Sequence, residues 1–254
     1  MKGVSSKVNV ETDGLVIKTQ KIGEQDTLIT VLTSSHGLIR AFVRRSTAVK
    51  SNLLATTQLL AYNDFVFYKG KNSWSVNSAQ PKASFFKLNE DLEAMSTAFY
   101  LAELFGELAP ENDNAEGLLK LLLNSLYLMA ERKRPPAQVK ATAELRALSN
   151  AGYMPNLVAC EHCGTYESNP MYFNPASGML LCSDCGGPAD GMQLSLSAVT
   201  AMRFICFSEE KKVFNFSLSD EALLELSQAA EQFALQQTGR TYRTLDFLKT
   251  IPRG

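Results

Sequence analysis

Residues 160–185 read CEHCGTYESNPMYFNPASGMLLCSDC, and this segment determines how the second half of the chain is organised. Two C-x2-C pairs, Cys160 with Cys163 and Cys182 with Cys185, are separated by eighteen residues. A two-residue gap lets both sulfurs of a pair reach one ion, and eighteen residues suffice for a hairpin that returns the second pair. The spacing predicts one structural Zn²⁺ per chain. Four protein sulfurs leave no open position for water or substrate, so a catalytic metal is not expected.

The composition is that of a cytosolic globular protein. The chain has 254 residues, of which 45% are hydrophobic, and no apolar run approaches the roughly eighteen residues of a membrane span. The first residues, MKGVSSKVNVETDG, lack the apolar stretch of a secretory signal. Because the cytosol keeps thiols reduced, the paired cysteines are better interpreted as metal ligands than as disulfides. The fifth cysteine, Cys206, lies among apolar residues and is expected to be buried.

The first eighty residues have the pattern of a small β-barrel. The sequences Ser34–Gly37 and Lys69–Asn72 are typical of hairpin turns. Five short strands with a long connection between the third and the fourth predict an OB-type nucleic-acid-binding domain over residues 1–80. The expected strands cover residues 14–18, 27–33 and 38–44, part of 57–68, and 73–78.

After Pro81 the hydrophobic period changes from two residues to about 3.6. This change predicts a helical domain, and helices are expected up to about Pro110, from about Asp113 to Met129, and from Pro135-Pro136 to Asn150. Further helices are expected over about 197–207, 219–237 and 244–248. The predicted fold is α+β and multidomain, with an N-terminal OB-type barrel and an all-helical domain that contains an inserted four-cysteine zinc knuckle. The helical domain is expected over residues 81–156 and 191–254, with the zinc insertion over 157–190.

The charge is unevenly divided along the chain. Through Lys87 there are twelve Lys and Arg against five Asp and Glu, a net charge of +7, whereas the remainder has thirteen against twenty-one, a net charge of −8. Cations interleaved with aromatic residues suit single-stranded nucleic acid, because cations hold phosphates and rings stack on bases. The candidate DNA-binding residues are Lys18, Arg40, Arg44, Arg45, Lys50, Lys69, Lys71 and Trp74.

The aromatic residues of the barrel have a second interpretation, since a barrel needs a core. Phe42, Phe65 and Phe67 are expected in that core, while Trp74 and Tyr68 fit either a core or an exposed position.

Arg132, Lys133 and Arg134 form a dense basic run in the acidic part of the chain. Cations at a helix C-terminus complement the helix dipole, and that alone could explain the run. The alternative is a docking point for an acidic peptide of a partner protein, for which Arg203 and Arg243 on the later predicted helices are further candidates.

Signatures of catalysis are missing from the sequence. It has two histidines, His36 in the predicted hairpin turn and His162 in the first knuckle, and no GxGxxG, GxxxxGK[ST] or HExxH pattern. We therefore expect a protein that is not an enzyme.

Taken in order, these features resemble the bacterial recombination mediator family RecO. The resemblance rests on the opening stretch Gly14–Thr19, on Gly23–Asp26 and on Leu32–Gly37. It rests equally on Gly152–Leu157 before the first knuckle, which matches the pattern G-Y-x-P-x-L-x-x-C-x-x-C-G, and on Gly178 before Cys182.

Membership of that family would imply a non-enzymatic role in DNA repair and recombination. Such proteins bind single- and double-stranded DNA, anneal complementary strands and engage RecR. They help RecA replace single-strand-binding protein, whose C-terminal tail would be bound here by the helical domain at Arg132, Lys133 and Arg134. The resemblance further implies a cytoplasmic, nucleoid-associated protein. The alternatives are an RNA-binding or ribosome-associated OB-fold zinc protein, and a zinc-dependent nucleic-acid enzyme.

Overall fold

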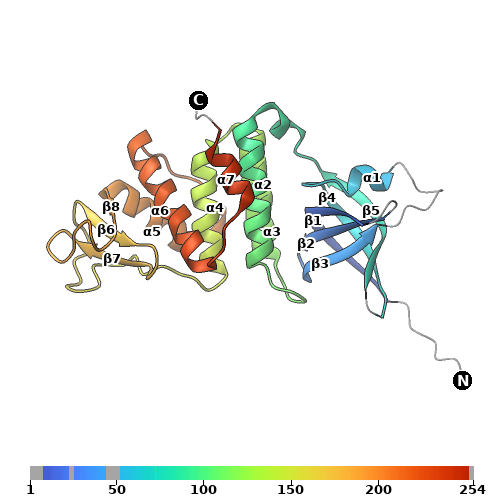
Figure 1. Ribbon diagram of the computed structural model, residues 1–254, viewed down its shortest axis with the longest axis horizontal. Helices are drawn as coiled ribbons and strands as arrows, with labels where there is room; N and C mark the ends of the chain where they lie inside the picture. Colours follow the sequence, from blue (N-terminus) through green and yellow to red (C-terminus); the bar gives the residue numbers. More distant parts are fainter. Residues whose placement is uncertain (1–7, 23–25, 44–51, 72, 252–254) are drawn as a thin grey trace, which may run out of the picture. The chain divides into compact units, whose positions relative to one another are not determined.

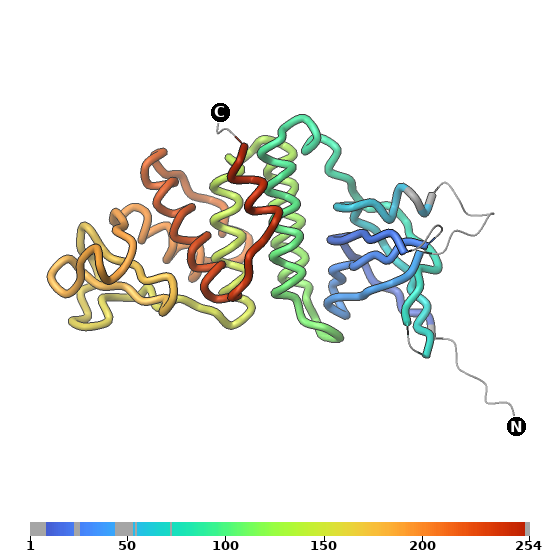
Figure 2. The backbone as a smooth tube through the Cα atoms, viewed as in Figure 1, coloured from blue at the N-terminus to red at the C-terminus, as the bar shows by residue number. Residues whose placement is uncertain are grey.

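The computed structural model describes residues 8–22, 26–43, 52–71 and 73–251, and the remaining residues are drawn in grey in Figure 2. Arg44, Arg45 and Lys50 therefore lie outside the described residues. The chain forms two compact units. The first is drawn from residues within 1–90 and 105–127, and the second from residues within 91–104 and 128–254.

The first unit contains a closed five-stranded barrel, which confirms the predicted OB-like fold (Figure 1). The strand order is β1-β2-β3-β5-β4, and the short helix α1 (Asn52–Thr56) falls between β3 and β4. All neighbouring strands run antiparallel except β3 and β5, which pair in parallel over two residues. The strands are β1 (Val8–Ile22), β2 (Asp26–Thr33), β3 (Gly37–Val43), β4 (Tyr62–Lys69) and β5 (Trp74–Ala83).

Strand β1 is three times as long as predicted, because one strand serves two neighbours. Its residues 8–15 pair with β4 and its residues 14–22 pair with β2. A β-bulge between Val16 and Lys18 marks the bend that this double role requires.

The barrel core is apolar and includes two of the three predicted phenylalanines. Phe65 and Phe67 are buried and stack with ring centroids 5.0 Å apart, whereas Phe42 is only half-buried. Burial of such rings stabilises the closed barrel through the apolar area removed from water. The cluster comprises Val16, Ile29, Val31, Ile39, Ala41, Val43, Phe65, Phe67 and Ala79.

The β2–β3 turn is held by the connection between helices α2 (Leu92–Leu108) and α3 (Glu116–Ala130). Leu38 donates its N–H to the carbonyl of Pro110 at 3.0 Å, and Ala115 donates to the carbonyl of Ser34 at 2.9 Å. Gly37 lies between them with φ +61°, and a Cβ there would come within 1.9 Å of the Pro110 oxygen. Only glycine fits this close approach.

The second unit is helical, as predicted, and includes a small sheet. Helix α4 packs against α5 and α6. Ser195 and Ser219 cap α5 and α6, and Gly239 ends α6 in the left-handed conformation. The sheet has the order β7-β6-β8 (Figure 1). The remaining elements are η1 (Phe86–Glu90), α4 (Pro136–Asn150), β6 (Met171–Asn174), β7 (Met179–Cys182), β8 (Met192–Leu194), α5 (Leu196–Phe207), η2 (Glu210–Lys212), α6 (Asp220–Thr238) and α7 (Arg243–Lys249).

A buried ion-pair network lies between the helices of this unit. The Lys140 ammonium is 2.9 Å from carboxylate oxygens of both Glu144 and Glu231. Glu144 is fully buried and accepts a hydrogen bond of 2.7 Å from the Tyr100 hydroxyl. Burial raises the pKa of Glu144 above its usual range even though Lys140 and Tyr100 act in the opposite direction. The carboxylate therefore depends on Lys140 for its charge.

Among the described residues, no helix is both long enough and apolar enough to cross a membrane.

Candidate metal centre and nucleic-acid interface

The four paired cysteines meet at one point. Their sulfur atoms all lie within 4.8 Å of one another, and the sulfurs of Cys163 and Cys182 are 3.6 Å apart. Cys160 and Cys182 are buried, whereas Cys163 is exposed. The hairpin of β6 and β7 returns the second pair to the first, with Met171 opposite Cys182. No histidine or carboxylate belongs to this cluster, so exposed His162 is not part of the donor set.

Each pair is shaped by a glycine that directly follows it. Gly164 donates its N–H to the Cys160 carbonyl and Gly186 donates to the Cys182 carbonyl, both at 2.9 Å. Gly164 has φ +73°, which favours glycine. Gly186 is needed for space, because a Cβ there would lie 2.7 Å from the Cβ of Leu181. Both turns thus close with the same backbone hydrogen bond, and together they bring the four sulfurs within 4.8 Å of one another.

The electrostatics of the cluster favour a bound cation. Burial opposes ionisation of the Cys160 thiol, but backbone hydrogen bonds from Cys163, Cys182 and His162 outweigh it and lower the pKa of Cys160 to about 6. Contacts with the sulfurs of Cys163 and Cys182 raise the pKa of Cys185 to about 12. Four sulfurs this close cannot all be ionised without a compensating charge. The donor set therefore fits a metal ion that takes four thiolates and leaves no open position.

A buried arginine connects helix α5 to residues 157–190, which we call the knuckle segment. Arg203 donates to the carbonyls of Leu157 and Tyr166, each at 2.6 Å, and to the Val158 carbonyl at 3.3 Å. Its guanidinium lies 4.0 Å from the centre of the Tyr166 ring. Because Arg203 is 7% exposed and occupied by carbonyls, it is not available to an external carboxylate.

The candidate DNA-binding cations that the structure describes are exposed, but they come from three different strands and a turn. Lys18 is on β1, Arg40 on β3, Lys69 on β4, and Lys71 in the β4–β5 turn. Arg40 is 3.7 Å from Glu111, so part of its charge is compensated.

The β4–β5 hairpin brings a cation and an aromatic ring together. Lys69 is opposite Trp74 in the strand register, and its ammonium lies 4.9 Å from the Trp74 ring centre. The ring is half-buried and makes an edge contact with Phe67 at 6.3 Å. Tyr68 is also half-buried. Trp74 therefore combines the two roles that the sequence left open, because it packs on the core and keeps part of its surface accessible.

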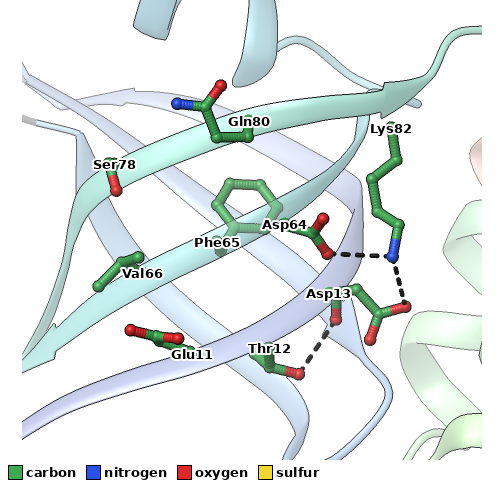
Figure 3. Close-up of a pocket in the computed structure, with 9 residues that line it drawn as sticks. All are labelled: Glu11, Thr12, Asp13, Asp64, Phe65, Val66, Ser78, Gln80 and Lys82. Atoms are coloured by element: carbon green, nitrogen blue, oxygen red, sulfur yellow. Dashed lines mark hydrogen bonds and ion pairs between the residues drawn. The ribbon is translucent and has the colours of Figure 1, made fainter.

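One face of the barrel carries carboxylates, which the summed charge did not indicate. Lys82 points between Asp13 and Asp64, with its ammonium 4.0 and 3.0 Å from their oxygens (Figure 3). Burial opposes ionisation of Asp13, but hydrogen bonds from Ser34 and Tyr62 and the charge of Lys82 together lower the pKa of Asp13. This hollow, lined also by Glu11, is anionic and does not suit a phosphate backbone.

The basic run at residues 132–134 follows helix α3, and its members have different surroundings. Arg132 is exposed with φ +51°. Its N–H donates to the Met129 carbonyl at 3.0 Å, and the N–H of Lys133 donates to the Leu128 carbonyl at 2.8 Å, which is the Schellman arrangement of a helix end. Arg134 is half-buried and donates from Nε to the Phe214 carbonyl at 3.0 Å. Arg134 therefore has a structural role, while Arg132 and Lys133 present their side chains at the surface.

Two family models together match almost the whole chain. One, described as Recombination protein O N terminal, matches residues 7–85, and the other, Recombination protein O C terminal, matches residues 89–246. The boundary between them falls directly after the barrel.

Curated relatives cover the chain from end to end. A protein named DNA repair protein RecO from Acetivibrio thermocellus is 35% identical over 245 residues, which are 96% of this chain and 98% of the relative. Proteins of the same name from Symbiobacterium thermophilum and Alkaliphilus metalliredigens are 30% and 28% identical. These matches cover 94% and 95% of this chain and 96% and 99% of the respective relatives.

Proposed function

Because this chain belongs to the RecO family of DNA repair proteins, we propose that it is a non-enzymatic mediator that binds single- and double-stranded DNA through its barrel. In this role it anneals complementary strands and, together with RecR, helps to load RecA onto DNA coated with single-strand-binding protein. The observation that carries the proposal is the exposed set of cations on an OB-like barrel that includes the Lys69–Trp74 pair. Cations provide affinity for phosphates and an accessible ring provides stacking.

The DNA-binding role predicts a defined loss of salt dependence. The triple change Lys18→Ala, Lys69→Ala and Lys71→Ala should weaken binding to single-stranded DNA and flatten the slope of log affinity against log salt by about 0.7 per lost contact, about two in total. Filter binding over a salt series measures both. The matched control, Lys120→Ala with Lys211→Ala and Lys212→Ala, removes the same charge outside the barrel.

Two results would contradict this assignment. One is an unchanged slope in the barrel variant, and the other is an equal loss in the control variant. Competition with RNA of the same sequence addresses the alternative function, since an RNA-binding protein would prefer the RNA.

We further propose that the metal held by the four cysteines is Zn²⁺ and that its role is structural. A closed set of four thiolates is the ligand set of structural zinc, and the ion would hold the two turns together without taking part in a reaction.

The helical unit is proposed to bind the acidic tail of single-strand-binding protein at Arg132 and Lys133. A planar guanidinium can pair with a carboxylate through two parallel hydrogen bonds. Of the two other arginines considered for this role, Arg203 is buried and occupied by three carbonyls, which argues against it, whereas Arg243 is exposed at the start of α7.

The backbone conformation of Arg132 allows its guanidinium to be removed without destabilising the fold, and this provides a test of the tail site. Because its φ is +51°, Arg132→Gly removes the guanidinium while relieving strain at the helix end, and should stabilise the fold by up to about 1 kcal/mol. Calorimetric titration with a synthetic tail peptide should show at least about a tenfold loss of affinity, the equivalent of roughly 1.4 kcal/mol. Lys211→Gly is a control cation outside the run. Unchanged peptide affinity in Arg132→Gly would show that the tail binds at a different site.

A further inference from the structure

The four cysteines of the cluster differ in their contact with solvent. Cys160 and Cys182 are 3% and 2% exposed, Cys185 is half-buried, and Cys163 is exposed. The susceptibility of a cysteine to oxidation follows its thiolate character and its exposure. A sulfur that ligates a metal is a thiolate, so every member of the cluster meets the first condition when the metal is bound. Cys163 meets both conditions and is the sulfur that a dissolved oxidant reaches first.

A second sulfur lies close enough to react with an oxidised Cys163. The sulfurs of Cys163 and Cys182 are 3.6 Å apart. Cys182 is the last residue of β7 and pairs with Met171 of β6, so the sheet fixes its position. Cys163 belongs to the first pair of cysteines and Cys182 to the second. A covalent bond between these two sulfurs would therefore join the two turns that the metal joins.

Cys160 is less suited to the same reaction. It is buried, and its sulfur accepts hydrogen bonds from the backbone N–H groups of Cys163, Cys182 and His162. Hydrogen bonds of this kind stabilise a thiolate and make it a weaker nucleophile. The surroundings of Cys160 thus favour its role as a metal ligand over a role in oxidation.

We propose that Cys163 is an oxidation site and that Cys182 resolves it, so that a hydroperoxide converts the two thiolates into a disulfide between the turns. The Cys163 sulfur attacks one oxygen of hydrogen peroxide, the O–O bond breaks, and hydroxide leaves behind a sulfenic acid. The Cys182 sulfur then attacks the Cys163 sulfur, the S–O bond breaks, and a second hydroxide leaves. Two protons from solvent convert the hydroxides into water. The two sulfurs together lose two electrons, which the peroxide takes up.

The disulfide would replace one cross-link of the knuckle segment by another. Only Cys160 and Cys185 remain as thiolates, which is too few for a structural metal site, so the ion is lost. The two turns stay joined, and Arg203 keeps its hydrogen bonds to the carbonyls of Leu157 and Tyr166. The oxidised segment therefore keeps its fold without the ion until a thiol reduces it. This exchange presupposes the metal role proposed above and is independent of DNA binding.

The test treats the full-length, metal-loaded protein with about one equivalent of hydrogen peroxide. After the free thiols are alkylated, mass spectrometry identifies the disulfide. No Lys or Arg occurs between Arg146 and Arg203, so trypsin leaves all four cysteines in one fragment. A protease that cleaves after Glu and Asp instead cuts at Glu161, Glu167 and Asp184 and places each cysteine in a fragment of its own. A metal-sensitive dye records release of the ion over the same period.

Two matched variants replace the second cysteine of each pair by histidine. Cys163→His and Cys185→His both keep three thiolates and add an imidazole, which is also a ligand set of structural zinc. Wild type and Cys185→His are expected to release the metal and to contain the disulfide between Cys163 and Cys182. Cys163→His should release the metal at least about tenfold more slowly, because its exposed thiolate is gone. Oxidised wild type should unfold at the same temperature with and without a chelator, unlike the reduced protein.

Metal release from Cys163→His at the wild-type rate overturns the proposal. So does a first disulfide that joins any other two cysteines, including Cys163 with Cys185. The disulfide found in wild type decides the matter alone if either variant fails to hold the metal. Wild type that contains no metal before oxidation contradicts the proposed metal role, and the pairing of its reduced thiols under peroxide still tests the oxidation site.

Discussion

Replacing Cys182 by Ser, or removing the metal with a chelator, is expected to unfold the knuckle segment and to destabilise the helical unit that carries it. Structural zinc in zinc-finger peptides contributes about 10 to 16 kcal/mol of apparent binding energy. That is comparable with the total stability of most domains, about 5 to 15 kcal/mol, so we expect the segment to lose its fold without the ion. The loss should spread to α5, because Arg203 holds the carbonyls of Leu157 and Tyr166 only while this segment is ordered. Differential scanning calorimetry and elemental analysis measure the effect.

Cys206 provides the matched control. It is buried, its sulfur is 3.6 Å from the Ser149 hydroxyl, and it does not belong to the four-sulfur cluster. Cys206→Ser should therefore keep the metal and cost no more than about 1 to 3 kcal/mol. If Cys182→Ser unfolds at the same temperature as Cys206→Ser, or protein with reduced thiols contains no metal, the assignment of a structural metal is wrong.

The second large effect is expected at the buried ion-pair network. Lys140→Met removes the cation that lies 2.9 Å from both Glu144 and Glu231. Glu144 is fully buried, so its charge is left without compensation, and breaking a buried pair in this way typically costs about 3 to 5 kcal/mol. Denaturant unfolding at neutral pH measures the change. The double variant Lys140→Met with Glu144→Gln should recover a large part of the loss, because residue 144 is then neutral and Glu231 keeps its ion pair with Lys249.

The loss should depend on pH with a definite sign. The pKa of Glu144 is raised by burial in the folded protein, and Lys140→Met removes the charge that lowers it, so the folded pKa rises further. A raised carboxyl pKa contributes stability below the unfolded-state value of 4.5 and loses that contribution as the pH rises through the folded value. The difference between wild type and Lys140→Met should thus be largest at neutral pH and shrink on acidification toward 4.5. Lys249 and Tyr100, which also contact this network, are present in both proteins. A difference that stays constant over this range would contradict the assigned role of Glu144.

Features with a local signature were predictable from the sequence. The C-x2-C spacing identified the four sulfurs that meet, and the turn sequence Ser34–Gly37 placed the β2–β3 hairpin. Apolar periodicity predicted the bounds of α4, α5, α6 and α7 to within one or two residues. In each case the information lies in residues that are neighbours in sequence.

Features that depend on partners distant in sequence were not predictable. The hydrogen bond from Leu38 to the Pro110 carbonyl uses backbone atoms, which every sequence possesses. Arg203 is buried because carbonyls satisfy it, and carbonyls have no sequence signature. The alternation of polar and apolar residues along β1 did not indicate that this strand would pair with two neighbours. The left-handed conformation of Arg132 was equally hidden, since that position is usually occupied by glycine.

The position of Trp74 makes the two units separately observable by spectroscopy. Trp74 is the single tryptophan of the chain, and its ring lies in the barrel between the Phe67 edge and the Lys69 ammonium. Indole fluorescence therefore reports on the barrel alone, whereas far-ultraviolet circular dichroism is dominated by the helices of the other unit. Unfolding curves recorded with the two signals coincide only when both units unfold in one cooperative transition. A metal chelator that shifts the dichroism curve and leaves the fluorescence curve in place would show that the barrel folds independently of the unit that carries the four cysteines.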